Sequence, residues 1–557
     1  MDDDRRSTIE SETAPGTLLC LVLALYGVTL LPFTLCTPLP LADYPNHLAR
    51  MYINEQLPTS TDLARYYSIQ WELLPNLALD LVVPALATVM SVETAMVVFA
   101  ALTLLIIATG AIALNLVLFN RRSLWPLAIF LLLYNRQFLW GFLNFLFTSG
   151  LMLWVFAAWV HFRERNPRTR LLLFAIPATT LYVGHLYPYA IYAIVIGGYE
   201  IGRGWQRFRQ HRQAVLWDWM TAGAQFVPGI VLFLTASSTK DRAEDVIMSS
   251  PYQKAAGLVD IFNNYSLSFD ILTLLLLGGL YIAGILMGVL RVHRLMWLPL
   301  LMLAAVYAAL PRVIFYVYNA DRRLIPAFAI LLVASTDLRT NSRRVRAAAA
   351  AVLGVLFVAR IVIISVVWAN TDGVYQKYIE AIDQIDRGSR LAILVASPES
   401  PALQNPPIDH IGCLAVLRKD AFVNSMFADR GQHTLHVLYN TDTRFYRSPS
   451  QSFRLRGELL ERGVPNVYGR VPLQRFDWVL IINQRFFPGQ PPPILTVAWQ
   501  DQQIDTVLYR VSGDMDSATV GAGHLEGSHF GDTSRSSPRA DQGGVVVPME
   551  TVTFQDP

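Results

Sequence analysis

The chain has 557 residues, of which 53% are hydrophobic and only 16% are charged. Because soluble domains typically carry about 25% charged residues, this composition excludes a disordered chain and an ordinary soluble enzyme. The formal net charge of +3 leaves no electrostatic footprint for nucleic acid, so we expect no nucleic-acid partner. The composition therefore indicates a protein that crosses a membrane several times.

Residues 1–16 are polar, and we expect them to lie in the cytoplasm. The apolar run 17–36 is long for the core of a signal peptide, and no small-residue cleavage site follows it. We therefore expect a retained first helix. The three cysteines, Cys20, Cys36 and Cys413, form no zinc, haem or disulfide pattern.

Further apolar segments recur as far as Trp368 and then stop. They lie near residues 77–90, 94–119, 124–140, 143–160, 171–185, 187–202, 219–236, 271–290, 295–311, 324–336 and 347–369. A helix needs about 20 residues to cross the hydrocarbon, so the shorter segments are ambiguous. We expect about 11 membrane-spanning helices, or about 13 if a broken segment hides a hairpin.

Basic residues gather in a few loops, which we expect to face the cytoplasm. These loops are 120–122, 161–170, 202–212, 291–294 and 337–346. They alternate with outward loops along the chain if the segment 77–119 crosses the membrane once in net. The loops 37–76, 135–142, the turn at His185, 237–270 and 311–323 then face outward. An odd number of crossings also places everything after Trp368 outside. The expected location is a bacterial inner membrane, with a multi-pass topology.

After Trp368 the long apolar segments give way to shorter segments with strand-like and helix-like patterns. The segments 391–398, 476–483 and 507–511 are typical of strands, and 410–424 has helix-like spacing. This pattern predicts an extracytoplasmic α/β domain over 370–512, attached to an α-helical polytopic membrane domain over 17–369. We see no catalytic signature in the α/β segment. The composition of 513–557 is typical of a disordered tail.

The first outer loop contains the sequence LADYPNHLAR, with Asp43 and His47 four residues apart. Pro45 favours the start of a helix that runs to about Gln56. That helix would place its apolar residues on one side and Arg50 on the other, a pattern typical of a helix at a membrane interface. Asp43 either caps this helix or acts in chemistry, and one side chain can do both.

This arrangement resembles the GT-C superfamily of polyprenyl-phosphate-sugar-dependent glycosyltransferases, such as the aminoarabinose and protein O-mannosyltransferase-like enzymes. The resemblance is one of architecture over residues 1–369: a first helix, a large outer loop that opens with an acid, many spans and an outer C-terminal domain. At the level of sequence motif, the resemblance is limited to Asp43. It implies that Asp43 is the catalytic base or a ligand of Mg²⁺ or Mn²⁺. The chain departs from the commoner pattern because no second acid adjoins Asp43. The sequence DYPNHLAR also resembles uncharacterised bacterial multi-pass proteins.

Two further outer turns hold candidate residues for binding substrate or lipid phosphate. Arg136 lies among aromatic residues in YNRQFLWGFLNF and would contact a sugar or phosphate, or else snorkel within an aromatic belt. Asn144 stands where GT-C relatives often have another acid, and an amide cannot act as a base. His185 ends one expected span and is either functional or simply hydrogen-bonded.

The outer loop PRVIFYVYNADRRLIP gathers Arg312, Asp321, Arg322 and Arg323. Topology does not require these outward arginines, so we expect them to hold an anion such as a lipid phosphate. The alternative is a salt bridge between Asp321 and an arginine of the loop, together with headgroup contacts. We expect the loop 237–270 to be a mobile outer segment that could close over substrate.

The expected function is transfer of a hexosyl or pentosyl group from a polyprenyl-phosphate donor to an extracytoplasmic glycan, lipid or protein. Asp43 would be the base, and a single displacement would invert the anomeric centre. Two alternatives stay open. One is a lipid or polysaccharide transporter or flippase, and the other is a membrane-anchored envelope assembly protein whose working part is 370–512.

Overall fold

A computed structural model describes residues 13–235, 246–314, 319–397, 405–428, 431–439, 454–456, 468, 471–487 and 489–512. The protein is mostly helical, and the chain as far as Ser512 forms one compact unit. The expected disordered tail and most of the expected cytoplasmic N-terminus lie outside the described residues.

Helices dominate the first 383 residues. They are α1 (Pro15–Thr29), α2 (Tyr44–Gln56), α3 (Thr61–Ala64), α4 (Ala78–Ala87), α5 (Val92–Phe119), α6 (Arg136–Trp140), α7 (Leu143–His161), α8 (Pro167–Gly184), α9 (Leu186–Phe208), α10 (Arg212–Ala224), α11 (Val227–Thr235), α12 (Pro251–Gly257), α13 (Leu267–Leu286), α14 (Trp297–Ala309), α15 (Leu324–Ala334) and α16 (Arg343–Asp383). In the described residues, α5, α7, α13 and α16 are long and apolar enough to cross a membrane. Shorter apolar helices are α1, α4, Arg294–Ala309 and α15.

Several of the expected apolar segments are not continuous α-helices. The first, 17–36, consists of α1 and a 3₁₀ helix, η1 (Leu31–Thr34). The segment 124–140 consists of a 3₁₀ helix, η2 (Trp125–Leu132), and the short α6. Asn135 separates them, because its side chain accepts a hydrogen bond from the N–H of Phe138 and so caps α6. The segment 219–236 is likewise divided between α10 and α11.

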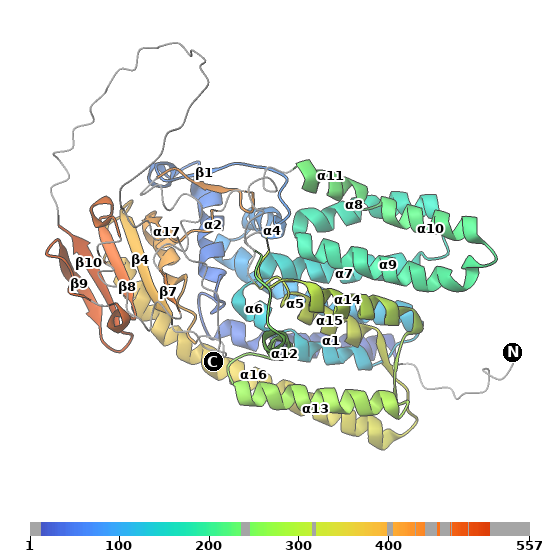
Figure 1. The fold of residues 1–557 in the computed structure, drawn as a ribbon. Coiled ribbons are helices and arrows are strands. Elements are labelled where there is room, and N and C mark those ends of the chain that lie inside the picture. The colour runs from blue at the N-terminus through green and yellow to red at the C-terminus, as the bar shows by residue number, and fades with distance from the viewer. Residues whose placement is uncertain are drawn as a thin grey trace, which may run out of the picture. The chain divides into compact units, whose positions relative to one another are not determined.

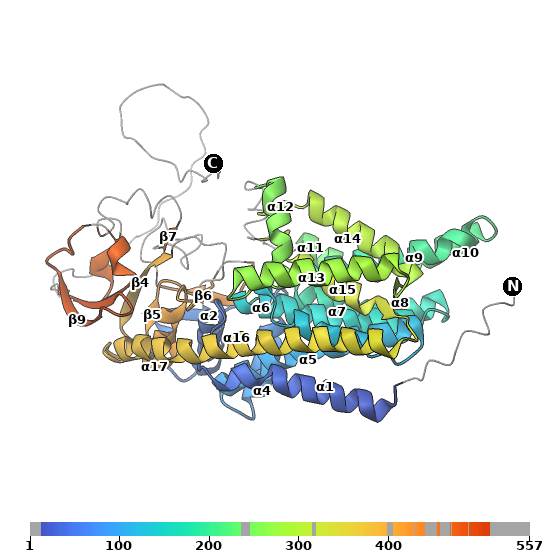
Figure 2. The ribbon, with the colours of Figure 1, turned by 90° about the horizontal axis from the view of Figure 1, so that it is seen from below.

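Helix α16 is 41 residues long and passes through the expected domain boundary at 369/370. At about 1.5 Å per residue it extends roughly 60 Å, about twice the hydrocarbon thickness of a bilayer. Its C-terminal part contacts α17 (Leu414–Lys419) and β9 (Leu495–Asp501), as both views show (Figures 1 and 2). The helical part and the sheet are therefore joined by one uninterrupted helix rather than by a linker.

The C-terminal segment forms a mixed sheet in the order β5-β4-β8-β10-β9, with β7 also paired to β4. Its other strands are β4 (Arg390–Ser397), β5 (Phe422–Val423), β7 (Arg454–Arg456), β8 (Trp478–Ile482) and β10 (Thr506–Val511). The strands β5, β7 and β8 run parallel to β4, whereas β10 is antiparallel to β8 and β9. The three strands expected from sequence are present, but the helix expected over 410–424 ends at Lys419 and gives way to β5.

The loops that we expected to face the cytoplasm lie together in the structure. The strands β2 (Leu290–Val292) and β3 (Thr336–Leu338) pair with each other, and Arg121 Nη2 lies 2.5 Å from Asp337 Oδ2. The loops 161–170, 202–212 and 291–294 line a shared cavity of about 560 Å³ with the residues Arg163, Glu164, Gly202, Arg203, Arg207, His293, Arg294 and Leu295. The basic loops thus form one group.

The loops that we expected to face outward form a second group. The N–H of Asp43 donates to the carbonyl of Trp140, and the N–H of Leu186 donates to the carbonyl of Pro75. The strand β1 (Tyr67–Ile69) pairs with β6 (Leu435–Val437), so the C-terminal segment joins this group. The two sets of loops therefore separate as the basic-residue pattern predicted.

Helix α2 is buried rather than interfacial, which corrects the prediction from its amphipathic pattern. It contacts α4 and α5, and also α17 and the 3₁₀ helix η6 (Ile411–Cys413). Arg50, expected on a solvated face, is fully buried and its Nη1 lies 2.7 Å from Oδ1 of Asp80 in α4. The hydroxyl of Thr434 also donates to Asp80. A buried ion pair thus replaces the expected contact with water.

We predict the topology of the C-terminal segment from the two groups of loops. Alkaline phosphatase fused after Ser512 should be active in cells, and a fluorescent protein fused there should be dark, because export prevents its folding. As the control, the fluorescent protein inserted after Asn166 should be bright. Bright fluorescence from the fusion at Ser512 would contradict the expected sidedness.

We also predict that Arg50→Met destabilises the protein strongly. It leaves the buried carboxylate of Asp80 unpaired, which typically costs about 3–5 kcal/mol. The unfolding temperature of the purified protein should fall, and adding Asp80→Leu to the same chain should restore most of the loss. The matched control is Arg65→Met, which removes an exposed pair with Asp62 that contributes about 0–1 kcal/mol. Equal stability of the Arg50 and Arg65 variants would contradict the prediction.

Candidate active site

Asp43 precedes α2, but its carboxylate does not cap the helix. The backbone torsions of Asp43 are φ −88° and ψ −6°, and its side chain makes no capping hydrogen bond. A capping residue typically has extended torsions that aim its oxygen at the first free N–H groups. Gly141 packs directly on Asp43, because a Cβ there would lie 3.0 Å from the Asp43 nitrogen. The carboxylate of Asp43 therefore does not cap α2.

The nearest ionisable group to Asp43 in the C-terminal segment is His410. The distance between His410 Nε2 and Asp43 Oδ1 is 3.6 Å. The side chain of His410 is only 3% exposed, whereas that of Asp43 is 22% exposed. The carboxylate thus has a buried histidine on one side and an opening to solvent on another. Sequence analysis missed His410, because only a weak Asp-His pair marks it.

Arg323 is an arginine of the outer loops that has no acidic partner among the described residues. Among the described residues no carboxylate lies within ion-pair distance of it, and its Nε is buried without a hydrogen bond. Its guanidinium carbon lies 4.2 Å from the ring centre of Phe142 and 5.4 Å from that of Tyr187. Burial lowers the pKa of Arg323 from its usual value, while Tyr187 and Asp43 raise it. Asp43 is therefore close enough to Arg323 for their charges to interact.

His185 and Arg323 direct two donors toward the same place. His185 Nδ1 accepts a hydrogen bond from the N–H of Tyr187, and His185 Nε2 lies 3.4 Å from Arg323 Nη1. Burial lowers the pKa of His185 well below its usual value, and the charge of Arg323 lowers it further. A neutral histidine whose Nδ1 accepts carries its proton on Nε2. His185 Nε2 and Arg323 Nη1 are therefore neighbouring donors, close enough for one anion to accept from both.

Arg136 and Arg322 share one buried acid instead of binding a ligand together. Their Nη1 atoms lie 3.4 Å and 3.2 Å from the two carboxylate oxygens of Asp260. Burial raises the pKa of Asp260, and the two arginines lower it. Arg136 also lies over the ring of Trp140, with 4.7 Å between the guanidinium carbon and the ring centre. Arg322 is therefore held by an acid that sequence analysis did not connect with it.

Asp321 pairs with a lysine and not with an arginine of its own loop. Its Oδ2 lies 2.7 Å from Nζ of Lys254 and accepts a hydrogen bond from the hydroxyl of Ser249. Arg312 holds the loop through its backbone N–H, which donates to the carbonyl of Ile247. The expected mobile segment 237–270 begins outside the described residues, and its described part contains α12. The contact of Lys254 ties this part to the arginine loop.

Asn144 has a structural role, which differs from its expected role in binding. Its Oδ1 accepts a hydrogen bond from the N–H of Leu79, and its Nδ2 donates to the carbonyl of Asn76. Asn144 therefore satisfies the first turn of α4 from the start of α7. With both ends of its amide used in this way, little remains to contact a substrate.

His47 is poorly suited to act as a base. Burial lowers the pKa of His47 to about 3, and the charge of Arg50 lowers it further, against a hydrogen bond to the backbone of Gly141. Its ring centre lies 5.5 Å from that of Phe427. Because proton transfer is efficient when the pKa of the base lies near the working pH, Asp43 is the better candidate of the expected catalytic pair.

The surroundings of Asp43 do not fit a divalent metal. In the described parts of the chain no three histidine, cysteine or acidic side chains converge as ligands. The atom of His410 that faces Asp43 is Nε2, and its other nitrogen, Nδ1, faces the amide nitrogen of Asn46. An imidazole held in this way presents N–H, not a lone pair, toward Asp43. The side chains described around Asp43 therefore do not form a set of ligands for a divalent metal.

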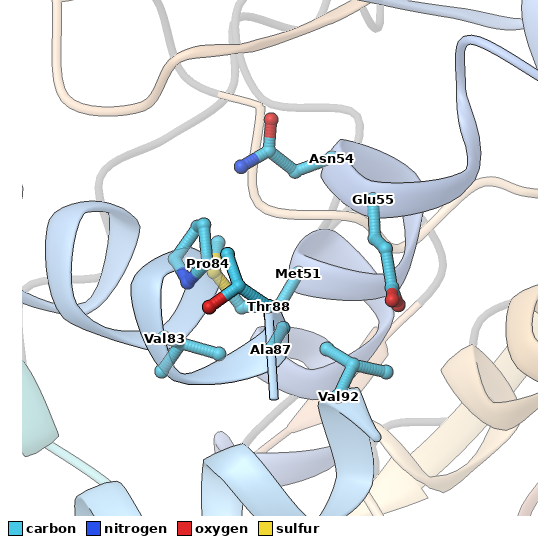
Figure 3. Close-up of a pocket in the computed structure, with 8 residues that line it drawn as sticks. All are labelled: Met51, Asn54, Glu55, Val83, Pro84, Ala87, Thr88 and Val92. Carbon is cyan, nitrogen blue, oxygen red and sulfur yellow. The ribbon is translucent and has the colours of Figure 1, made fainter. Parts of the chain in front are cut away.

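A separate small cavity lies further along α2. Its volume is about 260 Å³, and Met51, Asn54, Glu55, Val83, Pro84, Ala87, Thr88 and Val92 line it, as Figure 3 shows. These residues come from α2, α4 and the start of α5, and none of them is a candidate site residue. The candidate site is therefore defined by its cluster of side chains and not by this cavity.

Comparison of the chain with protein-family models and with curated proteins gives no match. A candidate function therefore has to follow from the geometry of Asp43, His410, His185 and Arg323.

We predict that Arg323→Gln weakens the binding of polyprenyl phosphate by about ten-fold or more, because a charge-assisted hydrogen bond is worth about 1.5–3 kcal/mol. Titration of the purified protein with polyprenyl phosphate, followed by tryptophan fluorescence, measures this affinity. The matched control is Arg485→Gln, an exposed arginine whose side chain is 70% exposed and pairs with Asp505. Equal affinity of wild type and the Arg323 variant would reduce Arg323 to a packing residue.

Proposed function

We propose that this protein is a membrane glycosyltransferase that moves a sugar from a polyprenyl-phosphate donor to an extracytoplasmic acceptor. The observation that carries the proposal is that one turn contacts both residues: Gly141 packs on Asp43, and the ring of Phe142 lies against the guanidinium of Arg323. Asp43 is a partly exposed carboxylate with no capping bond, and Arg323 is a cation with no acidic partner among the described residues. One can take a proton, and the other can hold a phosphate.

The reaction would be a single displacement at the anomeric carbon. The acceptor oxygen forms the new bond to that carbon, and the bond between the carbon and the phosphate oxygen breaks. The proton of the acceptor hydroxyl goes to the carboxylate of Asp43, and polyprenyl phosphate leaves with the electron pair. Such a displacement inverts the anomeric centre. Because phosphate is a good leaving group, catalysis needs mainly a base and stabilisation of the developing negative charge.

Arg323 and His185 would supply that stabilisation. Their N–H groups face one place, and the aromatic rings of Phe142 and Tyr187 restrict water around the guanidinium. A hydrogen bond from a fixed donor is stronger in such surroundings than in water. Arg136 and Arg322 are held by the single carboxylate of Asp260, which offsets one of their two positive charges.

The proposed setting is the outer face of a bacterial inner membrane. Four apolar helices of sufficient length support insertion, and the site lies in the group of loops that carries few basic residues outside the arginine loop. A polyprenyl chain would lie against the apolar helix surfaces, and its phosphate would reach Arg323 at their outer ends. The C-terminal segment would then be extracytoplasmic and would lie next to the acceptor.

A transporter or flippase has less support. Such proteins use ionisable groups near the middle of the membrane. The buried pair in the candidate spans, Arg360 and Asp270, has 2.9 Å between its atoms, and Arg360 also donates to the carbonyl of Phe262. Asp270 lies in the first turn of α13, and Arg360 lies within α16, where Asp270 and the carbonyl of Phe262 already satisfy it. The alternative of an envelope assembly protein makes no use of Arg323.

We predict that Asp43→Asn abolishes turnover without affecting folding. A general base contributes about 10²–10⁴-fold to the rate, and asparagine keeps the shape of the side chain. Because the carboxylate makes no capping bond, the unfolding temperature should not change. The assay uses polyprenyl phosphate that carries mannose or arabinose and measures release of free polyprenyl phosphate by mass spectrometry.

The control for this experiment is Asp62→Asn. Asp62 is an acid of the same outer loop, pairs with the exposed Arg65, and should be dispensable for turnover. If the Asp43 variant releases polyprenyl phosphate at the wild-type rate, Asp43 is not the base and the proposed mechanism is wrong.

A further inference from the structure

The C-terminal segment places a second layer of side chains behind Asp43. Asn46 in α2 is completely buried and contacts the C-terminal segment. Its Nδ2 lies 3.0 Å from Nδ1 of His410, and His410 Nε2 in turn faces Asp43. The order Asn46–His410–Asp43 is thus a chain of three polar side chains from two distant parts of the sequence.

Two backbone contacts fix the orientation of the Asn46 amide. The N–H of Phe427 donates to Asn46 Oδ1 at 2.9 Å, and Asn46 Nδ2 donates to the carbonyl of Ser425 at 2.6 Å. A backbone N–H can only donate and a carbonyl can only accept, so turning the amide over would break both bonds. The second hydrogen of Nδ2 is therefore the one that points to His410.

This fixed amide determines which nitrogen of His410 carries the proton. Because Asn46 Nδ2 is a donor, His410 Nδ1 must accept, and the neutral imidazole then has its proton on Nε2. A doubly protonated ring would place an N–H against the N–H of Asn46. The ring of Phe427 also covers His410, with 4.7 Å between the two ring centres. His410 is thus held as a neutral donor directed at Asp43.

We propose that His410 is a positioning residue for Asp43: its Nε2–H holds Oδ1 and so fixes the orientation of the carboxylate that takes the proton of the acceptor. The inference rests on the proposed function. His410 itself cannot be the base, because neither of its nitrogens offers a free lone pair. The distance of 3.6 Å exceeds that of a hydrogen bond. Catalytic contacts are often long in a ligand-free enzyme and shorten in the substrate complex, so we expect this one to close when donor and acceptor bind.

The test uses two substitutions that keep one or the other nitrogen position. The amide nitrogen of His410→Gln reaches about as far as Nε2 and can still donate to Asp43. The amide of His410→Asn reaches only as far as Nδ1, so its oxygen can accept from Asn46 but its nitrogen cannot reach Asp43. The full-length purified variants are assayed with polyprenyl phosphate that carries mannose or arabinose, and release of polyprenyl phosphate is measured. Unfolding temperatures are measured in parallel.

We expect kcat of the Asn variant to fall about ten-fold or more, as loss of a hydrogen bond to a charged group implies. The Gln variant should keep most of the wild-type kcat, and the KM for the donor should stay the same in both. Equal kcat values for the two variants, or a wild-type kcat for the Asn variant, would overturn the inference while leaving the role of Asp43 intact. Absence of turnover in the wild type would overturn the proposed function and this inference together.

Discussion

The burial of α2 on both sides is the constraint on which the candidate site depends. A helix that begins with Asp43 could have lain on the membrane surface, but the pair of Arg50 with Asp80 draws it against α4. On its other side, Asn46 binds the backbone of the C-terminal segment. Buried polar groups of this kind are costly when unpaired, so each one specifies a single position for the helix. Asp43 is held by its neighbours along α2 and by the turn at Gly141, and its side chain is 22% exposed.

The distribution of charge around the site follows a simple rule with one exception. Acids and bases at the outer helix ends are matched with each other: Asp260 with Arg136 and Arg322, and Asp321 with Lys254. Such pairs fix loops in place and offset part of their own charge: Lys254 is matched by Asp321, and Asp260 offsets one of the two positive charges beside it. Arg323 is surrounded by aromatic rings and lacks this balance among the described residues. A buried cation without a counter-ion costs free energy, which a bound phosphate would recover.

Sequence predicted the features that depend on local pattern and missed those that depend on distant partners. The alternation of basic loops predicted the two groups of loops, and the end of the first apolar run drew attention to Asp43. Sequence could not predict that Arg322 pairs with an acid while Arg323 has no acidic partner among the described residues, because Asp260 lies 62 residues from Arg322. Asn144 was expected to bind substrate because its hydrogen-bond partners are distant in sequence. Asn76 lies just before α4, and Leu79 lies in its first turn. His410 has no local motif, and its importance follows only from Asn46, which is 364 residues away.

The contact between Asn46 and His410 also has a consequence for biosynthesis. Ribosomes add about 5–20 residues per second, so α2 would be complete roughly 20–70 s before the segment that covers it. During that interval the amide of Asn46 lacks the backbone of Ser425 and Phe427, and the carboxylate of Asp43 lacks His410. All helices as far as α16 are synthesised before these contacts can form. A chain that stops short of this segment therefore lacks the contacts that Asn46 and Asp43 make with it.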